Sequence, residues 1–572
     1  MTTLTKRHCV FLLLLGVFAL PAFSQSDSID QLSSDFWTWR ARTAPYSGDD
    51  VNRIERPQGL RRDWSAKAIE DQRRQLASFD DRWKKLYGLS IRLNGGPVPI
   101  SKQVDVRLTG SALARVHWEL DILKRWQRDP NFYIEQTLTA LAEALTIPAP
   151  YDEKQSGEIL ARLDAIPAIL QQAQQNLQSP PGPFTKIAID NLTDVRQKLD
   201  QLTKALPGVT TIPAAQWQAS AAKAAAALEQ FRAYLEKILP TLPAHPQIGR
   251  ENYVWFLKNV ALMPYTPEEL IAAGEQEWHR AVSFESYEIN RNRDVPPLVP
   301  APDLETFIPR NQQAELAIRK FLAQKQILTL PDFLQHYTLR PMPPYLAPLA
   351  DFTEADDFTG PSRLNQDGIR YVNPPSPDAG YFWLADLKDP RIQIVHEGTV
   401  GHYGQLCISW KHPDPIRRQY YDSGANEGLG FYAEEMMLEA GLYDDSPHTR
   451  EIIYNQARLR ALRMIADVKI AIGAFTLEQA ADFLEHNVPM THANAWQEAV
   501  EMIELPGQKI SYQAGKLQIL KMLADARLQQ SDKFSLLDFH NSLWLNGNVP
   551  IALQRWEYLG KDDDLKKLND LK

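Results

Sequence analysis

The spacing of apolar side chains predicts a mostly helical protein. From Gln31 to about Ile238, apolar residues recur at intervals of three and four positions, as in residues 219–239. This period places apolar side chains along one face of an α-helix. Proline-rich stretches interrupt it, most clearly at residues 240–246. We therefore expect an N-terminal helical region over residues 25–240 and a second region over residues 241–572.

The second region departs from the helical pattern in one place. Residues 369–372 and 381–384 are short aromatic and β-branched runs on either side of a proline-rich stretch. Such runs are typical of strands, and together they predict a small β-hairpin. The run at 381–384 could be an edge strand that pairs with an extended peptide, although a buried structural strand is favoured. The predicted fold class is mostly α with a hairpin or minor sheet.

The first residues predict a secretory signal peptide. Lys6 and Arg7 precede an apolar run over residues 10–20, and Ala22-Phe23-Ser24 has the small residues of a cleavage site. This order is typical of a signal over residues 1–24, and the run is short for a permanent span. We expect a periplasmic or secreted protein without a stable membrane span after cleavage. An uncleaved anchor is the alternative.

Charge and cysteine content limit the partners and the crosslinks. Loss of the signal's two basic residues changes the net charge from −9 to −11. A negative chain without a basic stripe argues against a nucleic-acid or anionic-membrane partner. Only Cys407 remains after cleavage. An internal disulfide is therefore excluded, and stability must come from packing.

The segment from Val395 to His402 carries the residue types of a catalytic zinc site. Two imidazoles and a carboxylate can hold Zn²⁺, and a glutamate beside the first histidine can deprotonate a water molecule. His396 and His402 are six positions apart, with Glu397 next to the first. On an ideal helix the two imidazoles would lie about 120° apart and could not share an ion. A widened turn near Gly401 would bring them together. The alternative is two unrelated histidines.

A downstream helix offers a further carboxylate. Ser423 or Asn426 can cap a helix over about residues 427–440. Glu427 and Glu434 are seven positions apart and share a face of that helix. One could complete the zinc site and the other could orient a ligand from behind. For Glu434, a solvated surface charge is the alternative.

These segments resemble a bacterial family numbered as domain of unknown function 885, regarded as gluzincin-type metallopeptidases. The family pattern His-Glu, two variable residues, Pro-Gly-His and a later Gln is matched by His396, Glu397, Gly401, His402 and Gln405. The family's next pattern is matched by Glu427, Gly428, Tyr432, Ala433 and Glu434. The resemblance implies a multi-helical zinc-peptidase-like architecture with Zn²⁺ held by His396, His402 and Glu427. It makes Glu397 the general base and places Glu434 behind the ligands.

A third family pattern, Pro-Gly-Gln with a later Tyr and Gly, is matched by Pro506, Gly507, Gln508, Tyr512 and Gly515. By analogy with related helical zinc peptidases, the Tyr512 hydroxyl could stabilise the oxyanion formed during hydrolysis. A core tyrosine is the alternative. The family residues Arg460, Arg463 and Asp467 are also present.

The chain departs from the family at Val400, Ala471, Glu501, Met502 and Leu523. Because several of these positions are expected to contact the substrate, the departures predict a divergent branch with altered specificity or weakened catalysis.

The resulting hypothesis is zinc-dependent hydrolysis of peptide bonds in short peptides. The main alternative is a catalytically weakened, peptidase-like protein that binds peptides or an envelope partner. A structural helical scaffold is a third possibility. The peptide sequence, the position of cleavage and the oligomeric state are left open by the sequence.

Overall fold

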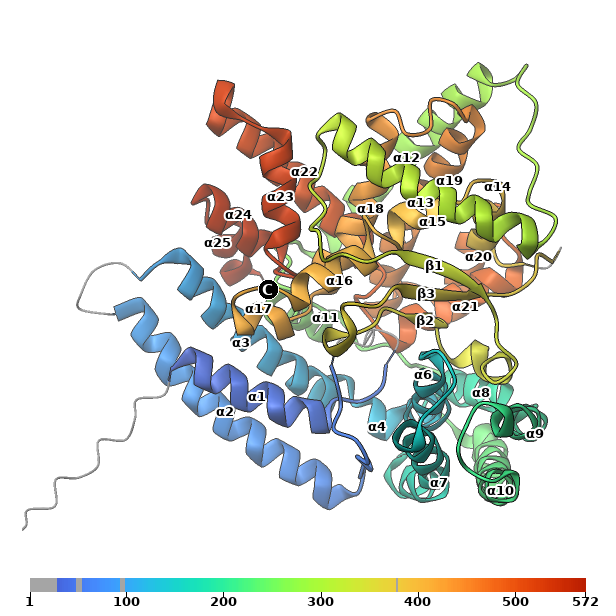
Figure 1. The fold of residues 1–572 in the computed structure, drawn as a ribbon. Helices are drawn as coiled ribbons and strands as arrows, with labels where there is room; N and C mark the ends of the chain where they lie inside the picture. The colour runs from blue at the N-terminus through green and yellow to red at the C-terminus, as the bar shows by residue number, and fades with distance from the viewer. Residues whose placement is uncertain (1–27, 48–53, 93–97, 377–378, 572) are drawn as a thin grey trace, which may run out of the picture.

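The computed structural model describes residues 28–47, 54–92, 98–376 and 379–571 (Figure 1). The predicted signal peptide lies outside these residues. The expected mostly helical fold is confirmed, with a small three-stranded sheet. Within the described ranges, no helix combines the length and apolar character that a membrane crossing needs.

The N-terminal part is built from helices and two π-helical turns. Two groups are visible in Figure 1, with α1 to α3 on one side of the molecule and α6 to α10 bundled on the other. The elements are α1 (Ile29–Thr43), α2 (Ala66–Arg92), α3 (Ile100–His117), η1 (Trp118–Leu123), α4 (Arg125–Arg128), α5 (Pro130–Ile134), η2 (Glu135–Thr139), α6 (Ala140–Thr146), α7 (Glu153–Asn176), α8 (Gly182–Asn191), α9 (Val195–Ala205) and α10 (Ala214–Ile238).

The C-terminal part is helical apart from its sheet. Side-chain caps fix several helix starts, such as the reciprocal capping box of Thr266 and Glu269 at α12. The helices are α11 (Arg250–Asn259), α12 (Pro267–Arg291), α13 (Leu304–Lys325), α14 (Tyr381–Lys388), α15 (Arg391–His396), α16 (His402–Trp410), α17 (Pro415–Gln419), α18 (Ser423–Glu439), α19 (Pro447–Ala471), α20 (Leu477–Asn487), α21 (His492–Glu504), α22 (Ile510–Gln530), α23 (Leu536–Leu545), α24 (Ile551–Leu559) and α25 (Asp563–Asp570).

The predicted β-hairpin is wrong, although one of its strands exists. Strand β3 (Gly368–Val372) pairs in parallel with β1 (Tyr337–Pro341) and antiparallel with β2 (Asp356–Asp357). Both edges of β3 are therefore occupied by other partners. The second run, residues 381–384, starts helix α14, and its aromatic rings are half-buried, with Trp383 edge-on to Phe307. A four-residue aromatic run suits a buried helix as well as a strand. Neither the favoured buried strand nor the alternative peptide-pairing edge strand is therefore present in this segment.

The sheet lies between the N-terminal bundle and α13. Ile369 and Tyr371 of β3 join the core formed by helices α5 to α10, and Val372 packs with Phe307 of α13 on the other face. Side chains alternate between the two faces of a strand. Arg370 therefore points toward the α13 side, where the segment between α15 and α16 lies.

Helices α18 and α22 pack with their backbones in contact. A Cβ atom added at Gly428 would lie 2.5 Å from the Cα atom of Gly515. Only glycine permits this approach. The contact brings the helix that carries Glu427 against the helix that carries Tyr512.

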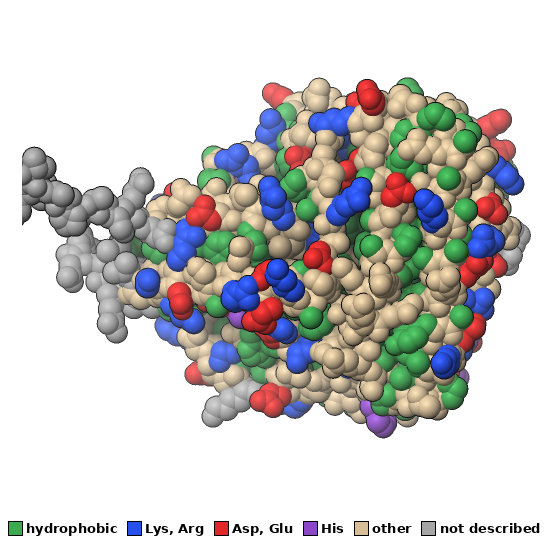
Figure 2. All heavy atoms as spheres, turned by 90° about the horizontal axis from the view of Figure 1, so that it is seen from below, with side chains coloured by type: hydrophobic (Ala, Val, Ile, Leu, Met, Phe, Trp, Pro, Cys, Tyr) green, Lys and Arg blue, Asp and Glu red, His purple; other side chains and the backbone are tan. Residues whose placement is uncertain are grey.

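The surface charges are mixed on the face shown in Figure 2. Lysine and arginine side chains alternate with aspartate and glutamate, and no continuous basic stripe crosses this face.

Candidate metal centre

The chain opens between the two histidines, as the sequence predicts. Helix α15 ends at His396, and α16 starts at His402. Between them the Tyr403 N–H donates to the Glu397 carbonyl at 2.9 Å, which is a reach of six residues instead of four. A Cβ atom at Gly401 would lie 1.7 Å from the carbonyl oxygen of His396. Glycine is therefore required for this wide turn. The turn allows two histidines that are six positions apart to approach each other.

The wide turn brings the two imidazoles to one place. Their ring centroids lie 4.8 Å apart. His396, Glu397 and His402 each offer a ligand atom, and these atoms lie within 4.8 Å of one another. Both histidines are buried. The alternative of two unrelated histidines is wrong.

Helix α18 adds Glu427 to this group. Its start is capped by Asp422, which accepts from the Ala425 N–H at 2.7 Å, and not by Ser423 or Asn426 as expected. The Glu427 Oε2 atom lies 3.0 Å from His402 Nε2 and 3.6 Å from His396 Nε2. A single carboxylate oxygen therefore faces both imidazoles.

Glu434 lies behind His396. It is about two helical turns after Glu427 along α18, on the same face of the helix. Its Oε1 atom is 2.7 Å from His396 Nδ1 and accepts from Arg460 Nη2, also at 2.7 Å. The Glu434 side chain is fully buried, so a solvated surface charge is excluded. The carboxylate fixes the imidazole on the side away from Glu427.

The surroundings of Glu397 and Glu427 favour the ionised form of both carboxylates. Burial would raise the pKa of Glu427, but His402 and His396 hold it well below its ordinary value. Burial also opposes ionisation of Glu397, yet His402 and Arg370 lower its pKa. Burial would lower the pKa of His396, and the carboxylates of Glu427 and Glu434 raise it to about 9. Negative charge therefore gathers around two imidazoles.

These donors fit a divalent metal ion of the zinc type. The Glu427 Oε2 atom is buried and makes no hydrogen bond with the described residues, even though two imidazole nitrogens are close to it. A shared cation would satisfy that oxygen and both nitrogens together. Two imidazoles with a carboxylate form a zinc-type donor set.

Tyr512 lies against the same group. Its ring is stacked on His396, with centroids 6.0 Å apart and planes 5° from parallel. Burial and the nearby Glu427 carboxylate raise the pKa of Tyr512 well above its ordinary value, so its hydroxyl keeps its proton. The ring is buried, as the core-tyrosine alternative requires, yet the residue also lines the cavities beside Glu397.

The turn before Tyr512 is held by Asp467 of α19. The Asp467 carboxylate accepts from the N–H groups of Gly507 and Lys509, each at 2.9 Å, and from the Tyr253 hydroxyl at 3.2 Å. Gly507 has a φ of +90°, which favours glycine. Asp467 therefore binds the backbone of the Pro-Gly-Gln turn and fixes the position of the start of α22.

Two cavities meet at the centre. The arginine-side cavity is lined by Arg370, Arg460 and Arg463 and has a volume of about 400 Å³. The acidic-side cavity, lined by Asp356, Glu427 and Glu504 among others, has a volume of about 370 Å³. Glu397 and Tyr512 line both. The two residues predicted to be catalytic therefore lie where the cavities join.

Sequence reasoning missed Arg370, Glu498 and Lys509 of the cavity walls, although the family pattern had named Arg463 and Glu501. Arg370 Nη1 lies 3.7 Å from Glu397 Oε1, and Arg463 Nε donates to Glu498 at 2.7 Å. Lys509 Nζ lies 2.5 Å from Glu501 Oε2. Alternation along a predicted strand could have placed Arg370 on one face, but no local signal identifies which element that face meets.

Only one of the five departures from the family pattern reaches the cavities. Glu501 lines both of them. Val400, Ala471 and Met502 are buried in the core, and Leu523 packs against a core cluster. The expectation that several departures alter substrate contacts is therefore wrong for these four positions.

Comparisons with known proteins agree with this fold. The family model of a bacterial protein of unknown function, DUF885, matches residues 43–556. A "putative lipoprotein of unknown function" from Shewanella oneidensis is similar in structure, with a TM-score of 0.68 and 18% identity, over 93% of this chain and 100% of that one. A "putative lipoprotein" from Colwellia psychrerythraea gives a TM-score of 0.70 at 17% identity, over 95% and 100% of the two chains. No curated protein matches the sequence.

Proposed function

Starting from the membership of this chain in the bacterial DUF885 family, whose function is unknown, we propose that the protein is a zinc-dependent peptidase acting on short peptides. One observation carries the proposal. The buried Glu427 Oε2 atom faces the Nε2 atoms of His396 and His402 without a hydrogen bond, directly beside the junction of two cavities.

In this proposal His396, His402 and Glu427 hold the metal. Bound zinc would acidify a water molecule and polarise the scissile carbonyl. The Glu434 Oε1 atom lies 2.7 Å from His396 Nδ1, and this position of the carboxylate would hold Nε2 toward Glu427. Arg460 in turn fixes the Glu434 carboxylate from α19.

Glu397 acts as the general base. Its lowered pKa keeps the carboxylate ready to accept a proton from water at the cavity junction. The same carboxyl group then gives this proton to the leaving amine. Arg370, 3.7 Å away, holds the carboxylate on the cavity side. A protein that only binds peptides would not need a base at this position, which favours turnover over the binding alternative.

Tyr512 stabilises the oxyanion. Its protonated hydroxyl belongs to a ring fixed by His396 on one side, with the Arg463 guanidinium 5.2 Å from the ring centroid. A fixed donor that needs no rearrangement during the reaction is worth more than a mobile one.

The size of the cavities favours short peptides as substrates, and separate observations favour the cell envelope as the place of action. Each cavity has room for only a few residues, which favours short peptides over folded proteins as substrates. The predicted signal peptide and the likeness to two proteins described as "putative lipoproteins" support a periplasmic or secreted location.

The test combines metal analysis with peptide digestion. We expect about one zinc ion per chain in the wild type and in Glu397→Gln, with peptide cleavage only in the wild type. The matched control is Glu439→Gln, an exposed glutamate on the same helix as Glu427, which should behave as the wild type. A wild type without bound metal, or digests that do not differ between wild type and Glu397→Gln, would overturn the proposal.

A further inference from the structure

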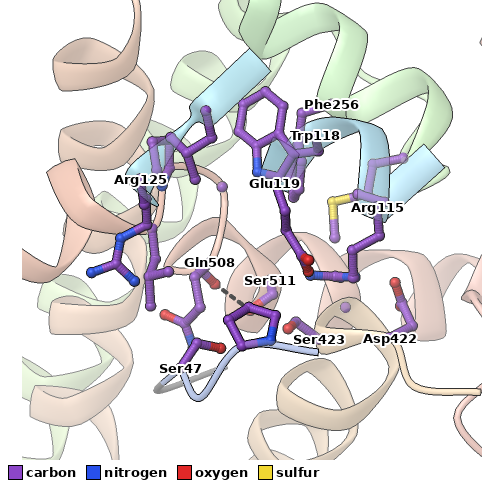
Figure 3. Close-up of a pocket in the computed structure, with 18 of the residues that line it drawn as sticks. Ser47, Arg115, Trp118, Glu119, Arg125, Phe256, Asp422, Ser423, Gln508 and Ser511 are labelled. Atoms are coloured by element: carbon purple, nitrogen blue, oxygen red, sulfur yellow. Dashed lines mark hydrogen bonds between the residues drawn. The ribbon is translucent and has the colours of Figure 1, made fainter. Parts of the chain in front are cut away.

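A third cavity lies between the N-terminal helices and the starts of α18 and α22 (Figure 3). In the close-up, the Trp118 and Phe256 side chains lie across the cavity from Ser47 and Ser423. Trp118 belongs to η1, Phe256 to α11 and Ser423 to the first turn of α18. We call it the apolar pocket.

The apolar pocket adjoins the acidic-side cavity. Ser47, Leu505 and Gln508 line both spaces. Gln508 Nε2 also donates to Glu427 Oε1 at 3.4 Å, so the shared wall contacts the proposed metal ligand. Ser511, which lines the pocket, directly precedes Tyr512. A group in the pocket would therefore lie one side chain away from the reacting centre.

The lining suits an uncharged, apolar group. Trp118, Leu123, Phe132 and Met263 contribute hydrophobic surface, and the Trp118 and Phe256 rings lie 4.9 Å apart. The pocket has a volume of about 70 Å³. On the same measure, a cavity that holds one water molecule needs only about 10 to 15 Å³. The space therefore matches a side chain and exceeds a single solvent molecule.

The charged residues that line the pocket all have partners, and they are Arg115, Glu119, Arg125 and Asp422. Arg125 binds Glu135 through two hydrogen bonds of 2.8 and 2.9 Å. Glu119 accepts from Arg40. Neither group has its charge free for a ligand, which argues against a charged occupant.

The walls near the centre are closely packed. A Cβ atom at Gly507 would lie 2.3 Å from Phe256 Cε1, and one at Gly424 would lie 2.6 Å from Met263 Cε. These glycines let the backbone of both helix starts pack directly on the aromatic and methionine side chains. The pocket is therefore already open in the structure without an occupant.

We propose that the apolar pocket is a specificity subsite that receives an uncharged aliphatic or aromatic side chain of the substrate peptide. The assignment rests on the proposed peptidase function. The substrate backbone would lie in the acidic-side cavity and its side chain would pass Gln508 into the pocket. A preference of at least about tenfold for such a residue over alanine at one position is expected.

The experiment changes the size of the pocket in both directions. Peptide pairs that differ by leucine, phenylalanine or alanine at one position are compared by kcat/KM on the zinc-loaded full chain. Ala261→Phe, at the wall, should lower cleavage of the leucine and phenylalanine peptides about tenfold and leave the alanine peptides unchanged. Leu123→Ala should shift the preference toward larger aromatic residues. Ala323→Phe, an exposed position on α13, is the matched control.

The outcomes separate the subsite from the peptidase. If the wild type cleaves peptides without any apolar preference, or if Ala261→Phe and Ala323→Phe keep the same preference as the wild type, the subsite is overturned while the peptidase stands. If nothing is cleaved, calorimetric titration of the same peptide pairs decides. Preferential binding lost in Ala261→Phe supports the pocket without hydrolysis, and absence of preferential binding overturns it.

Discussion

Two sides of one centre are built in different ways. The metal side, from α15 to α18, takes His396, His402 and Glu427 from one short stretch of chain. The opposite wall, from α19, α21 and α22, depends on pairs between separate helices, such as Arg463 with Glu498. The first side needs one local backbone shape, and the second needs three helices to dock.

The departures from the family pattern spare the proposed metal ligands: Val400 lies between the two histidines, but its side chain is buried in the core. A metal-binding group tolerates few changes, because ligand type and backbone opening are both fixed. On the wall, Glu501 replaces a family residue and still forms an ion pair, with Lys509. Paired charges at a partly exposed wall can be exchanged at low energetic cost. We therefore expect large, metal-dependent effects on the first side and small, substrate-dependent effects on the second.

The largest effect is expected from His402→Gln. Loss of one imidazole should remove stoichiometric zinc and lower kcat/KM at least about a thousandfold. Elemental analysis and peptide cleavage measure both. The control is His448→Gln, which changes a histidine of α19 that pairs with Glu451 outside the centre. Stoichiometric zinc and full activity in His402→Gln would show that His402 is not a metal ligand.

Gly401→Ala tests the backbone part of the metal side. Its new Cβ atom would collide with the His396 carbonyl, so we expect a loss of about 3 kcal/mol or more in the free energy of unfolding, together with weaker zinc binding. Denaturant titration with and without zinc measures the two effects.

Gly157→Ala in α7 is the control, because nothing lies within 4 Å of its Cβ position. We expect this helical substitution to be neutral or slightly stabilising. Equal stability of the two variants would show that the wide turn does not depend on glycine.

The sequence predicted the metal side much better than the wall, for the same physical reason. The imidazoles, the flanking glycine and the face shared by Glu427 and Glu434 follow from spacing within a few helical turns. The error at residues 381–384 arose because a short aromatic run carries no period. Which strand pairs with β3, and which face Arg370 meets, is decided by β1 and β2, whose positions no local pattern encodes.

The remaining site residues follow the same rule. Glu501 and Met502 are neighbours in sequence, but one lines the cavities and the other lies in the core. The rotation of α21 about its own axis decides which of these two side chains points toward the cavities. Packing against the neighbouring helices sets that rotation. The family pattern could identify both as departures and could not assign a role to either.

Arg460→Met sharpens the comparison, because Arg460 belongs to the wall side but acts on the metal side. Removing the guanidinium leaves Glu434 without its partner from α19, so the carboxylate should orient His396 less well. We expect zinc affinity to fall about 10- to 100-fold with the fold intact. Competition with a zinc chelator measures it.

The control for this variant is Arg458→Met. Arg458 lies on the same helix and pairs with Glu285, away from the metal centre. A zinc affinity in Arg460→Met equal to that of Arg458→Met would mean that Glu434 needs no support from α19.

The smallest effect is expected from Glu501→Gln on the wall. The Glu501 side chain is 39% exposed, whereas Lys509 is buried and also lies near Glu498, which still balances its charge when Glu501 is neutralised. Neutralising Glu501 changes the local charge that a substrate meets where the two cavities join, and we expect KM to change about two- to fivefold while zinc content and kcat stay constant. Glu478→Gln, an exposed change at the start of α20, should leave KM unaltered. Loss of zinc in Glu501→Gln would instead show that the two sides are coupled through Lys509 and the start of α22.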